Sequence, residues 1–99
     1  MYGTIARLTL KPGMQERFMQ LGQEIGSQGI PGWVAEYLYQ SDANPDEYFM
    51  AVVFESKEAY QANAASPEQD AIYQQMRALL AADPEWHDGT VVYAKPQGS

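Results

Sequence analysis

The stretch Glu47-Tyr48-Phe49-Met50-Ala51-Val52-Val53-Phe54-Glu55 decides the fold of this chain. Successive side chains of a β-strand point to opposite faces of a sheet, so residues 48, 50, 52 and 54 share one face and residues 49, 51 and 53 share the other. Both sets are apolar or aromatic, whereas a strand with one wet face alternates apolar and polar side chains. The stretch therefore predicts a central strand of an antiparallel sheet, buried on both faces.

Three further strands are predicted around it. Tyr2 to Leu10 is rich in β-forming residues and is broken by Lys11-Pro12-Gly13. Trp33 to Gln40 is the second strand, and the turn-forming residues 41–46 join it to the central one. Trp86 to Ala94 is the last strand. The alternation in the second strand predicts a row of side chains on one face, made of Trp33, Ala35, Tyr37 and Tyr39.

The segment between the first two strands predicts a helix. Its apolar stripe has spacings of four, three and four residues, which place the stripe on one helical face. Pro12 suits the first turn of this helix, and Gly26-Ser27-Gln28-Gly29 ends it. The stripe is formed by Met14, Phe18, Leu21 and Ile25.

Two helical segments follow the central strand. Ser56 can cap a short helix that holds Ala59, Tyr60 and Asn63. Ser66-Pro67-Glu68-Gln69 is a capping box, with the serine as the cap and the glutamine at the third helical position. The helix it opens has an apolar stripe and is stopped by Asp83-Pro84. That stripe consists of Ile72, Met76, Leu79 and Leu80.

The order strand, helix, strand occurs twice, which predicts an α+β, ferredoxin-like βαββαβ domain over residues 2–94, with a tail at 95–99. Its helices can cover only one face of the four-stranded antiparallel sheet. The other face would leave a large apolar patch in water, so we expect an identical copy to cover it and form a homodimeric α+β barrel. A monomer with an apolar sheet surface is the alternative.

Composition excludes several classes of partner. The formal net charge is −7 and the pI is about 4.4, without any cluster of Lys or Arg, so neither nucleic acid nor an anionic membrane surface is expected as a partner. The chain has no cysteine, which excludes disulfides and thiolate chemistry. No apolar stretch approaches the roughly 18 residues of a membrane span, and the N-terminus lacks the pattern of a signal peptide. We expect a soluble cytoplasmic protein.

Few residues suggest chemistry. The sequence has neither a Gly-x-Ser-x-Gly elbow nor a phosphate-binding glycine loop. His87 is the sole histidine, so a metal site is not expected, and His87 is either a proton acceptor or an ordinary strand-end residue. Asn63 and Tyr73 lie on the helices above the sheet, where they either face a pocket or serve as a cap and a core-edge residue. The row with Trp33, Tyr37 and Tyr39 is core, interface or pocket wall.

Three phrases of the sequence resemble one family. They are Ile5-Ala6-Arg7-Leu8-Thr9-Leu10-Lys11-Pro12-Gly13, Gly29-Ile30-Pro31-Gly32-Trp33, and Phe54-Glu55-Ser56-Lys57-Glu58-Ala59-Tyr60 followed by Ser66-Pro67. Over about residues 2–94 the chain resembles the antibiotic-biosynthesis-monooxygenase domain. The resemblance implies a homodimer with a pocket between sheet and helices in each subunit. It also implies oxidation of polyphenolic anthrones to quinones without metal or flavin.

The same family includes haem-degrading enzymes, which use an Asn, a Trp and a His ligand. The matching positions here are Ala6, Asn63 and Tyr73, and all three depart from that pattern, which argues against haem. Cofactor-free members use Asn, Trp and Tyr around the substrate. The resemblance thus implies a cofactor-independent monooxygenase of a small aromatic substrate.

The resemblance assigns roles to named residues. Asn63 and Tyr73 would orient the substrate and stabilise an oxyanion, and His87 is a candidate base. The expected substrate-binding residues are Ala6, Trp33, Phe54 and Tyr60. A non-catalytic binder of small aromatic molecules and another enzyme on this scaffold, such as an isomerase or a haem-degrading enzyme, are the alternatives.

Overall fold

The computed structural model describes residues 1–26 and 28–95. Ser27, in the predicted end of the first helix, and residues 96–99 of the predicted tail lie outside the described residues. The elements follow the order β1 (Tyr2–Thr9), α1 (Gln15–Gly26), β2 (Trp33–Gln40), β3 (Glu47–Phe54), α2 (Lys57–Ala64), α3 (Pro67–Arg77) and β4 (Glu85–Thr90). The predicted βαββαβ order is confirmed, with the second helical region divided into α2 and α3.

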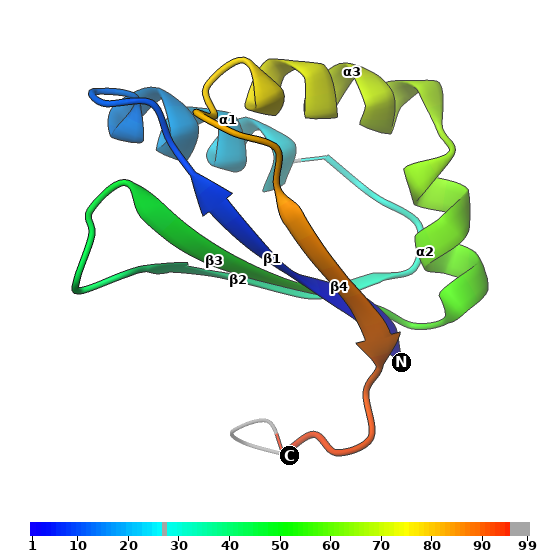
Figure 1. Cartoon of the computed structure of the whole chain (residues 1–99). Helices are drawn as coiled ribbons and strands as arrows, with labels where there is room; N and C mark the ends of the chain where they lie inside the picture. Colours follow the sequence, from blue (N-terminus) through cyan, green and yellow to red (C-terminus); the bar gives the residue numbers. More distant parts are fainter. Residues whose placement is uncertain (27, 96–99) are drawn as a thin grey trace.

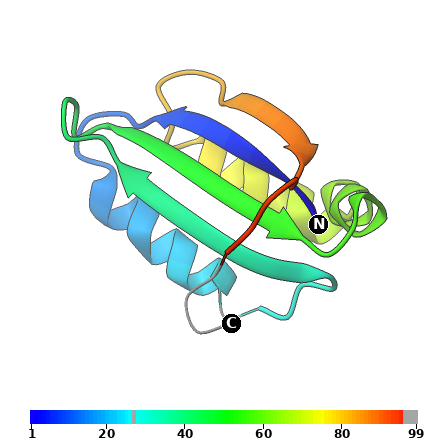
Figure 2. The ribbon, with the colours of Figure 1, turned by 90° about the horizontal axis from the view of Figure 1, so that it is seen from below.

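The four strands form one antiparallel sheet in the order β2-β3-β1-β4. The central position predicted for the 47–55 stretch is confirmed, because β3 lies between β2 and β1. All three helices cover one face of this sheet (Figure 1). Within residues 1–26 and 28–95, no helix covers the other face, as the view from below shows (Figure 2). This is the expected α+β, ferredoxin-like architecture.

The core lies between the sheet and the helices. Side chains from the covered face of β1, chiefly Leu8, are fully buried against α1 and α3. The ring of Phe18 from α1 packs on that of Tyr48 from β3, with centroids 5.3 Å apart. Each such side chain contributes roughly 1.5–3 kcal/mol on burial. The buried cluster comprises Ala6, Leu8, Leu10, Phe18, Tyr48 and Leu80.

The first helix begins later than predicted. Pro12 lies in a turn before α1, which starts at Gln15. Gly13 has a φ of 82°, a left-handed conformation that interrupts right-handed helical geometry. The predicted place of Pro12 in the first helical turn is therefore wrong. The two serine caps are confirmed, since the side chain of Ser56 accepts a hydrogen bond from Ala59 N and that of Ser66 accepts one from Gln69 N.

A β-bulge in β2 overturns the predicted aromatic row. Trp33 pairs with Phe54 and Ala35 pairs with Val53, so Val34 is an extra residue on β2. The extra residue reverses the alternation. Trp33 shares the helix-covered face with Phe54, whereas Tyr37 and Tyr39 lie on the open face beside β3.

The last strand is shorter than the predicted 86–94. Its neighbour β1 begins at Tyr2, and the final backbone hydrogen bond runs from Val91 N to Met1 O at 3.0 Å. Beyond this point no described strand offers a partner. Residues 91–95 leave the sheet on the side of its open face (Figures 1 and 2), with Val92 94% and Tyr93 78% exposed.

The open face is apolar at its centre. Its largest exposed apolar side chains are Ile5 from β1, Tyr37 and Tyr39 from β2, and Phe49 from β3. Toward one end, Arg7 forms ion pairs with Glu47 at 2.7 Å and Glu85 at 2.8 Å. None of the helices in the described residues is both long and apolar enough to cross a lipid bilayer.

Candidate functional site

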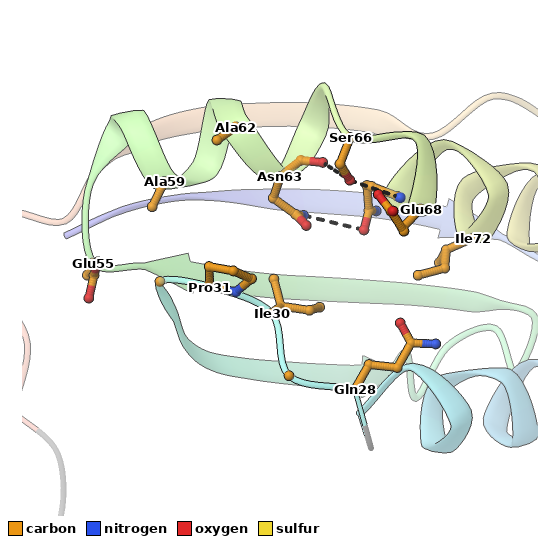
Figure 3. Close-up of a pocket in the computed structure, with 13 residues that line it drawn as sticks. Gln28, Ile30, Pro31, Glu55, Ala59, Ala62, Asn63, Ser66, Glu68 and Ile72 are labelled. Carbon is orange, nitrogen blue, oxygen red and sulfur yellow. Dashed lines mark hydrogen bonds between the residues drawn. The ribbon is translucent and has the colours of Figure 1, made fainter.

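A cavity of about 420 Å³ lies beneath α2 and the start of α3. Its other wall is the segment 28–32, which leads into β2 (Figure 3). We call it the main cavity. Ligand pockets of proteins commonly enclose about 300–1,000 Å³, so the volume suits a small organic molecule. Apolar side chains predominate in its lining, chiefly Ile30, Pro31, Ala59, Ala62 and Ile72.

Asn63 projects from α2 into the main cavity, toward the wall that carries Ile30 and Pro31 (Figure 3). Its Nδ2 donates a hydrogen bond of 3.3 Å to Oε1 of Gln69. Ser66 fixes both ends of this pair, because its hydroxyl donates to the Asn63 carbonyl oxygen at 2.9 Å and accepts from Gln69 N at 3.1 Å. The Ser66 cap thus also orients the polar pair of the cavity. The second half of the predicted capping box is not formed, because Gln69 Oε1 accepts from Asn63 and Ser66 N donates to the Asn63 carbonyl oxygen at 3.1 Å.

This pair retains hydrogen-bonding capacity. An amide side chain offers two N–H donors and an acceptor oxygen. The Asn63–Gln69 bond uses one donor of Asn63 and one acceptor site of Gln69. Among the described residues, Asn63 Oδ1 and Gln69 Nε2 form no hydrogen bond. Both groups are therefore available to a polar atom of a ligand.

Two further cavities beneath the helices share lining residues with the main cavity or with each other. A middle cavity of about 80 Å³ shares Asn63 and Gln69 with the main cavity, and adds Trp33 and Phe54. An apolar cavity of about 230 Å³ follows beneath α1, and it shares Ile25 and Glu36 with the middle cavity. We call the three together the groove. Two of the predicted substrate-binding residues, Trp33 and Phe54, thus lie in the same groove as Asn63.

Glu36 is the site residue that the sequence did not reveal. It faces Val52 across the β2–β3 pair and lines both the middle and the apolar cavity. The residue keeps contact with solvent at the sheet edge, yet partial burial raises the pKa of its carboxyl above the ordinary value. In the sequence, Glu36 is the single charged residue between Trp33 and Leu38, and this isolated carboxylate was the one feature that could have pointed to it.

Tyr73 lies in a different cavity, of about 360 Å³, on the β4 side of α3, which we call the second cavity. There its ring approaches that of Trp86, with centroids 6.4 Å apart. Tyr60 lines the same cavity and donates a hydrogen bond of 2.9 Å to Asp88. Desolvation and this hydrogen bond raise the pKa of Tyr60 to about 12. Gln69 lines both this cavity and the main one, so it stands between Asn63 and Tyr73.

Two predicted site residues, Ala6 and His87, line neither the groove nor the cavity that contains Tyr73. Ala6 is fully buried in the core cluster. His87 pairs with Ile5 and lines a hollow of about 280 Å³ on the open face, opposite the helices.

Within residues 1–26 and 28–95, no group of three or more His, Cys, Asp or Glu side chains could hold a metal ion.

Comparison with known proteins identifies the family. The sequence profile described as antibiotic biosynthesis monooxygenase matches residues 1–75. No curated protein matches the sequence significantly.

Solved structures show the same fold. A candidate antibiotic biosynthesis monooxygenase from Chloroflexus aurantiacus J-10-fl is 26% identical, with a TM-score of 0.79 and 98% of each chain covered. SnoaB, a cofactor-independent oxygenase from Streptomyces nogalater, is 18% identical, with a TM-score of 0.82 and 97% of each chain covered. A further candidate of the same description, from Caulobacter crescentus CB15, is 18% identical with a TM-score of 0.82, covering 93% of this chain and 90% of its own. The chain belongs to the antibiotic biosynthesis monooxygenase family.

Proposed function

We propose that this protein is a cofactor-independent monooxygenase that oxidises a small, polyphenolic aromatic substrate in the groove. The observation that carries the proposal is the Asn63–Gln69 amide pair, fixed by Ser66 in an otherwise largely apolar cavity. Membership of the family supports the reaction class. SnoaB, which has the same fold, is described as a cofactor-independent oxygenase.

The reaction needs little from the protein beyond binding and polarity. A methylene carbon flanked by phenolic rings loses two hydrogens, one atom of O₂ becomes the new carbonyl oxygen, and the other leaves as water. Once deprotonated, the substrate itself supplies the electrons that reduce O₂. The protein then has to orient the substrate, exclude water and stabilise the developing oxyanion.

Asn63 is the residue to which we assign orientation and oxyanion stabilisation. Its amide is held by the bond to Gln69 and reaches into the main cavity. Trp33 and Phe54 provide aromatic walls in the adjoining middle cavity. Tyr73 and Tyr60 would act from the second cavity, across Gln69. His87 receives no role, because it lies on the opposite face of the sheet from the groove.

Oxygen uptake with 1,8-dihydroxyanthrone as the probe tests the proposal. The wild-type protein should accelerate uptake and release the corresponding quinone. Asn63→Ala should lower kcat/KM about 100-fold, since loss of one oxyanion donor costs 10²–10³ in rate. Gln61→Ala removes an exposed amide from the same helix and should leave the rate unchanged.

The outcomes separate the possible functions. A rate that Asn63→Ala leaves intact, but that Tyr73→Phe reduces, would move the site to the second cavity. A rise in melting temperature with the probe, without any oxygen uptake by the wild type, would identify a binding module in place of an enzyme.

We also propose that two copies of the chain pair through their open sheet faces. The support is the row of exposed apolar side chains there, including Ile5 at 56% and Tyr37 at 62% exposure. Soluble monomers seldom expose large contiguous apolar patches. Such pairing leaves the groove accessible, because the groove lies on the other face of the sheet.

A further inference from the structure

We infer that Glu36 is the proton acceptor of the groove, the group that deprotonates the bound aromatic substrate. This inference rests on the proposed oxidation, which begins with the loss of a proton from the substrate. It concerns a residue to which neither the sequence motifs nor the family resemblance assigned a role.

The position of Glu36 is the first support. It lines the middle cavity together with Asn63 and Gln69, and the apolar cavity together with Leu38 and Met50. A planar molecule held at the amide pair would extend past Trp33 and Phe54 toward this carboxyl group. The polar pair and the carboxylate would then act on the same ligand.

The charges around the groove are the second support. Glu36 is the only charged side chain among the described residues that line the middle and apolar cavities. The groups that face it from α1, β3, α2 and α3 are apolar or neutral amides. The main cavity adds two further carboxylates, Glu55 and Glu68, and its described lining contains no cationic side chain. Such a site disfavours a substrate that arrives as an anion, and it suits a neutral phenol or carbon acid.

The chemistry of the carboxyl group is the third support. Desolvation raises the pKa of Glu36, so its carboxylate is a stronger base than that of an ordinary glutamate. A general base works best when its pKa approaches the working pH. The transfer is balanced, because one proton passes from the substrate to the carboxylate, which leaves a substrate anion and a neutral Glu36.

The first test uses 1,8-dihydroxyanthrone under argon, so that no oxidation follows. Wild-type protein should bind the neutral probe and produce the absorption band of its anion at a pH where the free probe remains neutral. Glu36→Gln should bind the probe without that band. Glu36→Asp, which keeps the carboxylate on a shorter side chain, should retain part of it. Glu16→Gln, at an exposed position of α1, should behave as the wild type.

The second test admits oxygen. In the wild type, kcat/KM should rise with pH through a midpoint above 4.5, the ordinary pKa of glutamate. Glu36→Gln should lower the highest value of kcat/KM about 10²–10⁴-fold, and kcat/KM should no longer rise with pH in this range. Replacement by glutamine removes a partly desolvated charge, so the melting temperature of Glu36→Gln should be at least that of the wild type. This measurement serves as the control that the variant is folded.

The outcomes distinguish the two proposals. An anion band that depends on Glu36 but is followed by no oxygen uptake would retain the proton acceptor and overturn the oxygenase. Oxygen uptake that Glu36→Gln leaves unchanged, with the same rise with pH, would overturn the proton acceptor alone. A wild-type protein that binds no probe at all would overturn both.

Discussion

At the scale of single residues, Tyr60 shows how one side chain links the helices to the last strand. Its hydroxyl reaches from α2 to Asp88 on β4, and its ring packs edge-on against Tyr2 and Phe54 at centroid distances of 5.3 and 5.8 Å. These contacts join the end of the sheet to α2. The second cavity therefore depends on Tyr60 for its shape as well as its lining.

The Tyr60 hydroxyl should stabilise the fold in a pH-dependent way. Its pKa in the folded chain is about 12, against an ordinary value of 10.0. For an acid whose pKa is raised by folding, the associated stability is present below pH 10 and is lost as the pH rises from 10 to 12. Tyr60→Phe should lower the free energy of unfolding by about 1 kcal/mol at pH 7, the usual contribution of one hydrogen bond.

Urea denaturation at pH 7 measures this difference, and the absorbance of tyrosinate on alkaline titration measures the pKa. Tyr93→Phe is the control, because Tyr93 is 78% exposed and forms no hydrogen bond among the described residues. Equal stability of the two variants would show that the Tyr60–Asp88 bond contributes nothing. A phenol at residue 60 that titrates near pH 10 would contradict its burial.

The sequence placed Asn63 on a helix above the sheet but left open whether it faced a pocket or served as a cap. In the structure Asn63 lines the main cavity. Its separation from Tyr73 was not predictable, because it depends on how Gln69 fills the space between two cavities. The place of Glu36 in the site was not predictable, since the partial burial of its carboxyl depends on α1, which is distant in the sequence.

At the scale of elements, the junction of α2 and α3 couples helix capping to the site. Ser66 caps α3 and also binds the carbonyl oxygen of Asn63. Ser56 caps α2 in the same way, but its side chain touches neither member of the amide pair. The chain thus contains two serine caps that differ mainly in their link to the main cavity.

Ser66→Ala and Ser56→Ala should each lower the free energy of unfolding by about 1 kcal/mol, the typical loss for an N-cap. Only Ser66→Ala should also weaken binding of the anthrone probe, because it releases the backbone of Asn63. Thermal unfolding and a probe titration measured on both variants check this. If both variants lost affinity equally, helix stability would explain the effect, and Ser66 would have no separate role in positioning.

The element boundaries show which features local sequence can define. The caps at Ser56 and Ser66 are local motifs, and they were predicted correctly. The bulge at Val34 and the end of β4 at Thr90 depend on which residues the neighbouring strand presents. The β-forming residues 91–94 have the same sequence pattern whether or not a partner strand lies beside them. The periodicity of one segment therefore cannot predict where its pairing with a neighbour ends.

At the scale of the whole molecule, the two faces of the sheet differ in what covers them. The covered face holds the core and the groove, and the open face carries Ile5, Tyr37, Tyr39 and Phe49 without any cover from the described residues. The apolar run 48–54 predicts burial on both faces, and the helices of the described residues cover only one. The uncovered face alone therefore supports the proposed pairing of two copies.

Ile5→Glu should convert the dimer into a monomer. Ile5 lies on central strand β1, between Ala51 and His87, so the substitution would place one carboxylate from each copy in the middle of the interface. Burying unpaired charges costs several kcal/mol, which should raise the dissociation constant of the dimer about 100-fold or more. Sedimentation velocity should find the wild type at twice the 11.1 kDa mass of the chain and the variant at that mass.

Ala71→Glu is the matched control, since it adds the same charge at an exposed position of α3, on the opposite side of the sheet. This variant should remain dimeric. A wild type that sediments at 11.1 kDa across micromolar concentrations would refute pairing through the open face. A variant Ile5→Glu that stays dimeric would show that the two copies meet elsewhere. Because the groove lies on the covered face, a monomeric Ile5→Glu protein should still bind the anthrone probe, which separates assembly from the site.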